Sequence, residues 1–210
     1  MRKAQHFIVP LLLWIIIIPL AFFLTRSSSR KSEEKAITQP KTELIEYTQK
    51  SVPSESHEGT CWSESIAAYT NTKAWRCYSG DFIYDPCFET DVGRVVCGVD
   101  PEDEKSGFEL KLTKPLPERG NFSDRTKRIW RLKLSNGLIC RPFMGTAGLV
   151  DGEYYYYNCG NEKTVIFGDL ELHQHIDKTM PLWKVTVSYL SDDYSKIIKN
   201  EVLDILKMWE

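Results

Sequence analysis

Residues 129–140 read IWRLKLSNGLIC, and this stretch carries the strongest short-range signal of fold in the chain. Its first half alternates, with Trp130, Leu132 and Leu134 on one face and mainly basic residues on the other, as in a strand that is buried on one side. Asn136-Gly137 follows, and Asn-Gly between alternating runs predicts a β-hairpin with a type I′ turn, because both central residues of that turn need positive φ.

Working outward from this hairpin, other runs show strand composition and are bounded by Gly, Pro, Asn or Asp. They are residues 74–77, 82–84, 108–112, 138–140, 153–159, 164–167 and 182–189. About eight strands of this kind predict a mainly β fold, a small disulfide-stapled antiparallel barrel or sandwich.

The C-terminal stretch permits two structures. Ser191-Asp192-Asp193 is a suitable helix cap, and apolar residues follow at helical spacing, which modestly favours a C-terminal helix. The alternative is a closing strand with Leu203, Ile205 and Trp209 pointing inward.

The N-terminal part predicts a membrane anchor. Phe7 to Leu24 is an uncharged apolar run of about the length that crosses a bilayer. It lacks the small-residue cleavage site of a signal peptide, which favours an uncleaved signal anchor over a cleaved signal. We therefore expect four parts: a short flank (1–6), a transmembrane signal anchor (7–24), a flexible polar stalk (25–58) and an exported β-rich disulfide domain (59–210).

All six cysteines follow the apolar run, and their number is even. Their spacing lacks the C-x-x-C pairs of zinc sites, so a disulfide framework in an oxidising compartment is favoured. Six cysteines allow fifteen connectivities. The expected pairing joins neighbours along the chain, since each bridge then closes a local loop between adjacent strands: Cys61 with Cys77, Cys87 with Cys97, and Cys140 with Cys159. This places the domain outside the cytoplasm, in a single-pass protein of the cell membrane.

The charge of the exported region argues against a nucleic-acid partner. Residues 59–210 contain nineteen Lys and Arg against twenty-three Asp and Glu, whereas nucleic-acid binding calls for a basic domain or stripe. The nearest candidate is the basic stretch 119–141, which we interpret as the solvated face of strands.

Several cysteine-containing segments resemble a known group of sequences. Cys61-Trp62, Ala74-Trp75-Arg76-Cys77 and residues 83–88 (IYDPCF) are similar to an uncharacterised family of bacterial exported or membrane-anchored proteins with a CW…AWRC…IYDPCF pattern. The resemblance extends more loosely over most of the region after Gly59. It implies an exported bacterial domain with a strand-like C-terminal end, and it assigns no catalytic or binding residue.

Motifs for catalysis are missing from the sequence. It contains no G-x-S-x-G, no P-loop and no G-x-G-x-x-G. His173 and His175 would share a strand face, but no third metal ligand is evident, so we expect neither a metal nor a cofactor. The turn residues Asp85, Asp100, Asp151 and Asp169 could supply the carboxylate pair of a glycosidase, although Asp is common at turns for hydrogen-bonding reasons alone.

Aromatic residues are the most suggestive feature of the exported region. It contains five of the six tryptophans and the run Tyr154, Tyr155, Tyr156 and Tyr157. In a strand, the even-numbered tyrosines share one face and the odd-numbered ones share the other. Exposed aromatic platforms bind sugars or peptides, whereas buried ones fill the core. We accordingly take these tyrosines as the candidate binding face.

The sequence thus favours a non-enzymatic binding or interaction module of the cell envelope, with a glycan or protein as its expected partner. The alternative is an envelope hydrolase that uses paired carboxylates.

Overall fold

The computed structural model describes residues 39–121, 125–145, 148–168, 172 and 175–210. All of these belong to one compact unit, Gln39–Glu210. The expected anchor, residues 7–24, lies outside the described residues. Within the described part, no helix has the length and apolar character needed to span a bilayer.

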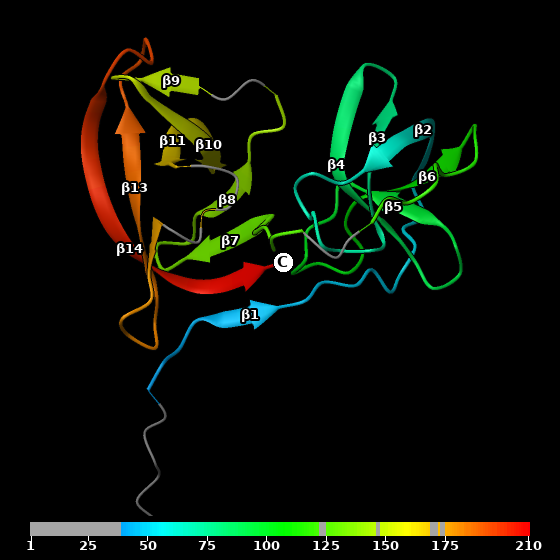
Figure 1. Cartoon of the computed structure of the whole chain (residues 1–210), viewed down its shortest axis with the longest axis horizontal. Coiled ribbons are helices and arrows are strands. Elements are labelled where there is room, and N and C mark those ends of the chain that lie inside the picture. Colours follow the sequence, from blue (N-terminus) through cyan, green and yellow to red (C-terminus); the bar gives the residue numbers. More distant parts are fainter. Residues whose placement is uncertain (1–38, 122–124, 146–147, 169–171, 173–174) are drawn as a thin grey trace, which may run out of the picture. The chain divides into compact units, whose positions relative to one another are not determined.

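The N-terminal half of this unit forms a closed five-stranded barrel (Figure 1). Each strand is antiparallel to the next, and the last strand returns parallel to the first and closes the barrel. We call it the first barrel. Its strands are β2 (Ser56–Glu64), β3 (Ala74–Ser79), β4 (Phe82–Glu89), β5 (Val95–Cys97) and β6 (Phe108–Leu112).

The C-terminal half forms a second ring of paired strands, the second barrel. The long strand β14, red in Figure 1, pairs with β13 over its first part and with β7 near its end, so the sheet closes on itself. The ring consists of β7 (Arg131–Leu134), β8 (Ile139–Pro142), β10 (Glu153–Cys159), β11 (Asn161–Phe167), β13 (Lys184–Leu190) and β14 (Ile197–Trp209).

Three short strands flank the second barrel. They are β1 (Glu43–Ile45), which runs parallel to the end of β14, β9 (Gly148–Val150), which pairs with β10, and β12 (Ile176–Asp177), which pairs with β13. The mainly β, antiparallel architecture predicted from the sequence is therefore confirmed, but the strands divide between two barrels. The compact unit also begins at Gln39, so β1 and the start of β2 fall within the range expected for the stalk.

The hairpin predicted at residues 129–140 is present as β7 and β8. Its turn differs from the predicted type I′. Of the turn residues only Gly137 has positive φ, at 86°, and its N–H donates to the Leu134 carbonyl at 3.0 Å. A three-residue loop that ends in a left-handed glycine satisfies the same hairpin geometry.

The two barrels have different cores. In the second barrel the buried cluster is mostly aliphatic and includes Leu132, Leu134, Val187 and Ile205, all with no exposed surface. In the first barrel the cluster has eight buried residues, and four of them are cysteines. Cysteines therefore make up half of the buried residues in the first core.

The three disulfides join the pairs expected from the sequence: Cys61–Cys77, Cys87–Cys97 and Cys140–Cys159. Each joins two residues that lie directly opposite one another on neighbouring antiparallel strands. All six cysteines are buried, and none of them is free. The first barrel contains two of the bridges and the second barrel contains one.

The favoured C-terminal helix is wrong, because residues 197–209 form the strand β14. Ile198 and Val202, which lie on the apolar face of the expected helix, are each 63% exposed, whereas Leu203 and Ile205 are buried. The segment pairs with β13 and with β7, so its backbone hydrogen bonds are made to neighbouring strands and its end closes the second barrel. The expected helix cap instead forms a turn, in which Asp193 accepts hydrogen bonds from Ser191 and Ser195.

Trp130 departs from the predicted alternation. Ile129 joins the core of the second barrel with Leu132 and Leu134, while Trp130 packs in a separate cluster against Phe88 and Tyr47, with ring centroids 5.2 Å apart in both cases. This cluster contains residues of both barrels and lies where they meet.

Candidate functional site

The tyrosine run occupies β10 and divides as a strand requires. Tyr155 and Tyr157 are 7% and 0% exposed and belong to the core, where the Tyr157 hydroxyl donates to the Ile129 carbonyl at 2.6 Å. Tyr154 is 54% exposed, and its ring lies 6.4 Å from that of Tyr156. Only Tyr154 and Tyr156 are therefore placed to form part of a binding face.

A second group of exposed apolar side chains lies on the first barrel. Trp62 and Tyr78 are each 42% exposed, and their ring centroids lie 5.8 Å apart on neighbouring strands. Ile83 lies opposite Tyr78 in the β3–β4 pairing and is 51% exposed. These side chains form a short aromatic and aliphatic row on the outside of this barrel.

The four candidate carboxylates do not converge. Asp151 lies in the turn between β9 and β10 with a positive φ of 52°, which fits a structural role, and Asp169 lies outside the described residues. Asp85 and Asp100, in contrast, both line one pocket.

Asp85 is held by its neighbours rather than presented to solvent. Its side chain has no exposed surface. It accepts hydrogen bonds from the Ser65 hydroxyl and from the backbone N–H groups of Ile66 and Ala67, and Arg76 Nε lies 3.8 Å away. Burial raises the pKa of Asp85 to about 6, and the hydrogen bonds and Arg76 act in the opposite direction.

The histidine pair cannot be assembled from the described residues. His173 lies outside them, and His175 is exposed, with its backbone N–H bonded to the Leu172 carbonyl. In the described part of the chain, the only group of three potential metal ligands is Cys77, Cys87 and Cys97. These sulfurs are already bonded in disulfides.

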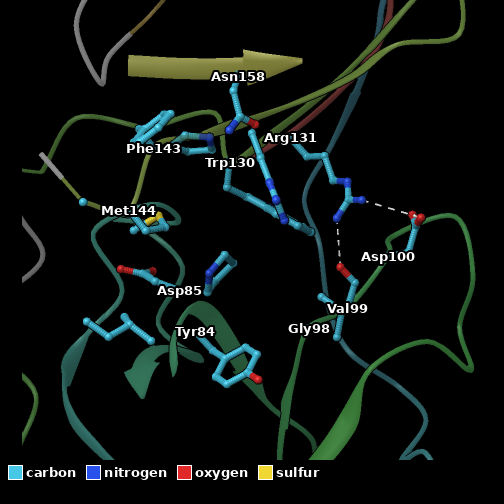
Figure 2. A pocket seen from close by; sticks show the side chains of 15 residues that line it. Tyr84, Asp85, Gly98, Val99, Asp100, Trp130, Arg131, Phe143, Met144 and Asn158 are labelled. Carbon is cyan, nitrogen blue, oxygen red and sulfur yellow. Dashed lines mark hydrogen bonds and ion pairs between the residues drawn. The ribbon is translucent and has the colours of Figure 1, made fainter. Parts of the chain in front are cut away.

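The pocket that contains Asp85 and Asp100 has a volume of about 530 Å³ (Figure 2). Residues of β4 and of the turn after β5 line one side, and residues of β7, β8 and β10 line the other. The second barrel contributes four side chains that carry hydrogen-bond donors: Trp130, Arg131, Arg141 and Asn158. We name it the inter-barrel pocket.

Arg131 is held in the inter-barrel pocket by two contacts with the first barrel's side. One terminal nitrogen donates to the Val99 carbonyl at 2.9 Å, and the other lies 3.6 Å from an Asp100 carboxylate oxygen (Figure 2). Burial lowers the pKa of Arg131, Asp100 acts to raise it, and the positive charge of Arg141 lowers it further.

Side chains of the basic stretch 119–141 form ion pairs and stacking contacts with acidic and aromatic residues of other segments. Arg119 stacks over Trp75 at 3.8 Å and pairs with Glu89. Arg125 pairs with Glu64, and Lys133 pairs with Glu102 at 2.6 Å. These side chains are therefore used in contacts within the protein, rather than forming the plain solvated face that the sequence suggested.

Comparison of the chain with family models, with curated proteins and with solved structures finds no match. The geometry of the chain itself therefore carries the functional argument.

Sequence reasoning did not single out Trp130, Arg131, Arg141 or Asn158 as a site. The available signal was the concentration of arginines next to an alternating hairpin. A site could not be read from it, because the opposite wall of the pocket comes from strands about fifty residues earlier in the sequence.

Proposed function

We propose that this protein is a membrane-anchored, extracytoplasmic binding module of the cell envelope. Residues 7–24 would hold it in the membrane as a single-pass signal anchor, and the β-rich domain would bind an envelope glycan or protein without catalysing a reaction. The resemblance to exported bacterial sequences agrees with this assignment.

Export is supported by the cysteines. All six form disulfides, and each is at most 3% exposed. Disulfides of this kind persist in oxidising compartments and are rare in the cytosol. Bridges in the core of both barrels are consistent with folding after export.

Binding, rather than catalysis, is supported chiefly by which polar groups of the inter-barrel pocket have hydrogen-bond partners and which do not. Its two carboxylates already have partners, since Asp85 accepts three hydrogen bonds and Asp100 faces Arg131. In the same pocket, buried donor groups have no partner among the described residues: Trp130 Nε1 and Arg131 Nε. A concave site with a small number of placed polar groups is typical of ligand binding.

Two measurements on the full chain in detergent test the proposal. Intact mass after thiol alkylation should show no modification before reduction and six alkyl groups after it; six reactive thiols before reduction would contradict export. Co-sedimentation with isolated envelope fractions should retain the folded protein, and the same protein unfolded by reduction should be lost from the pellet. Equal recovery of both forms, or no recovery of the folded form, would contradict a binding module.

One observation favours a hydrolase as the second candidate. Asp85 and Asp100 line the same pocket, and a carboxyl group with a pKa near 6 suits a general acid. Release of soluble fragments from envelope material, abolished in Asp85→Asn and retained in Asp151→Asn, would support this alternative. Absence of release by the folded chain would remove it.

A further inference from the structure

The inter-barrel pocket contains more hydrogen-bond donors than the protein uses. Arg141 lines the pocket and is exposed, and neither it nor the Asn158 side chain has a hydrogen bond or ion pair with any described residue. Trp130 is 3% exposed, and its buried indole Nε1 has no partner in that part of the chain. Burying a donor without a partner costs about 1–3 kcal/mol, so the indole N–H of Trp130 calls for an acceptor.

Strand register places three of the pocket's donors, Arg131, Arg141 and Asn158, in a row. Arg141 on β8 pairs directly with Asn158 on β10. On the other side of β8, Leu132 of β7 pairs with Cys140. The preceding residue of β7, Arg131, therefore lies beside Arg141. Leu132, Cys140 and Cys159 point into the barrel core. Since side chains alternate along strands, Arg131, Arg141 and Asn158 share the outer face that lines the pocket.

Two neighbouring guanidinium groups repel one another when no anion lies between them. Asp100 offsets part of the charge of Arg131, and Arg141 has no acidic partner among the described residues. Guanidinium groups bind the oxygens of phosphate and carboxylate through paired hydrogen bonds, and they do so most strongly away from bulk water. An oxyanion would therefore satisfy both the donors and the charge.

The number and arrangement of the donors favour phosphate over carboxylate. A carboxylate offers two oxygens in one plane, which a single arginine can satisfy. Here the donors come from three different strands, with Arg131 on β7, Arg141 on β8 and Asn158 on β10. Trp130, which directly precedes β7, adds a fourth donor. A tetrahedral phosphate has oxygens in several directions and can accept from donors spread in this way.

The remainder of the pocket suits an apolar or ring-shaped body attached to the phosphate. Phe143, Met144 and Trp130 line the pocket (Figure 2), as do Ile83, Pro86 and Val99 from the first barrel. A volume of about 530 Å³ falls within the range of small-molecule sites, roughly 300–1,000 Å³.

We propose that the inter-barrel pocket binds a phosphate group carried on a small ring-shaped or apolar body, with Arg141, Arg131 and Asn158 as ligands for the phosphate oxygens. This proposal rests on the proposed function, because it names the ligand class of the binding module. A soluble phosphate ester and a lipid headgroup share this chemistry, so the test separates them.

Isothermal titration of the full chain in detergent with phenyl phosphate is the direct test, with benzoate and benzyl alcohol as matched probes. We expect phenyl phosphate to bind at least tenfold more tightly than benzoate, and benzyl alcohol to bind most weakly. Equal affinity for all three would overturn the proposal, because the ring alone would then account for binding. Co-sedimentation of the chain in nanodiscs with phosphatidylglycerol vesicles, reduced by excess phenyl phosphate, would identify a lipid headgroup as the source; sedimentation that phenyl phosphate leaves unchanged would contradict a lipid ligand in this pocket.

Two variants locate the site. Arg141→Met removes an exposed guanidinium from a strand surface and should weaken phenyl phosphate binding at least tenfold. Lys111→Met removes an exposed charge from β6, outside the pocket, and should leave the affinity within twofold. Asn158→Asp adds a negative charge beside Arg141 and should also weaken binding. An unchanged affinity in Arg141→Met with an unchanged fold would overturn the assignment.

The envelope co-sedimentation experiment separates this proposal from the broader one. If Arg141→Met no longer binds phenyl phosphate but still sediments with envelope fractions, the pocket is a phosphate site and the envelope contact lies elsewhere. If wild-type chain sediments with envelope fractions but phenyl phosphate does not bind, the pocket assignment fails and the binding module stands. Failure of both measurements would reject both proposals.

Discussion

The cores of the two barrels are stabilised in different ways. The second barrel encloses an aliphatic core with one disulfide, and the first barrel encloses a smaller core in which four of eight buried residues are cysteines. A small barrel buries little apolar area against the conformational entropy of its chain. Covalent links compensate for this in the first barrel, whereas the second barrel relies on side-chain packing.

The largest expected effect comes from removing both bridges of the first barrel. The loops they close span 16 and 10 residues, and the chain-entropy model gives about 3 kcal/mol for each. Replacing Cys61, Cys77, Cys87 and Cys97 by Ala should destabilise the protein by about 6 kcal/mol. Hydrogen exchange should show loss of protection in β3 and β4, measured by mass spectrometry.

The matched control for this experiment is the Cys140→Ala, Cys159→Ala variant, whose bridge closes a loop of 19 residues. Its loss should cost about 3 kcal/mol, and β13 and β14 should stay protected. If this variant loses more protection than the one without the two first-barrel bridges, the first barrel does not depend on its disulfides more than the second barrel does.

The next effect tests the aliphatic core directly. Ile205 on β14 has no exposed surface and packs with Leu132 and Leu134. Ile205→Ala should lower the free energy of unfolding by about 2–5 kcal/mol, because it removes buried methyl groups and leaves a cavity. Urea denaturation followed by tryptophan fluorescence would measure the change.

Val202→Ala is the control on the same strand, since Val202 is 63% exposed. It should change stability by less than about 0.5 kcal/mol. The pair also distinguishes strand from helix, because residues three apart share a face in a helix and lie on opposite faces in a strand. Equal and large costs for both variants would favour the helix over β14.

Those elements of the fold that depend on neighbours in sequence were predictable. The β7–β8 hairpin followed from alternation and Asn136-Gly137, and the disulfides joined successive cysteines in pairs, on strands that pair directly. Both features are local, so a sequence pattern carries them. The division into two barrels depends instead on the return of β6 to β2 and on the closure of β14 onto β13 and β7, which no local pattern encodes.

The candidate site was harder to predict for the same reason. The odd and even tyrosines of β10 could be assigned to two faces, but which face is buried depends on where the barrel closes. Arg131 and Arg141 were visible as part of a basic stretch. Their place in a pocket, however, depends on the contacts that Arg131 makes with Asp100 and Val99 from the first half of the unit. Trp130 broke the alternation because it packs where the two barrels meet.

A smaller effect is expected from the buried hydroxyl of Tyr157. It donates to the Ile129 carbonyl at 2.6 Å in the core of the second barrel. Tyr157→Phe should cost about 1–2 kcal/mol, because it leaves a buried carbonyl without this donor. Tyr154→Phe alters an exposed ring on the same strand and should be neutral in thermal unfolding. If both changes prove neutral, the second core does not depend on this polar contact.

The smallest effect concerns pH and belongs to the first barrel. The pKa of Asp85 is raised by burial from 3.8 to about 6, so the folded state holds its proton more tightly than the unfolded state. The stability that this proton contributes is fully present below pH 3.8 and is lost as the pH rises through about 6. Lowering the pH from 7 to 5.5 should therefore increase the free energy of unfolding by about 1 kcal/mol through this group.

Other carboxylates act in the opposite direction, since ion pairs lower the pKa values of Glu64 and Glu102. The measurement is therefore the difference between wild type and Asp85→Asn, in which their contributions cancel. Denaturant unfolding at both pH values should show the gain in wild type relative to the variant, and hydrogen exchange should place it in β3 and β4 rather than in β13 and β14. A difference that stays constant between pH 7 and 5.5 would mean that Asp85 remains ionised in the folded protein, held by Ser65 and Arg76 more strongly than burial opposes it.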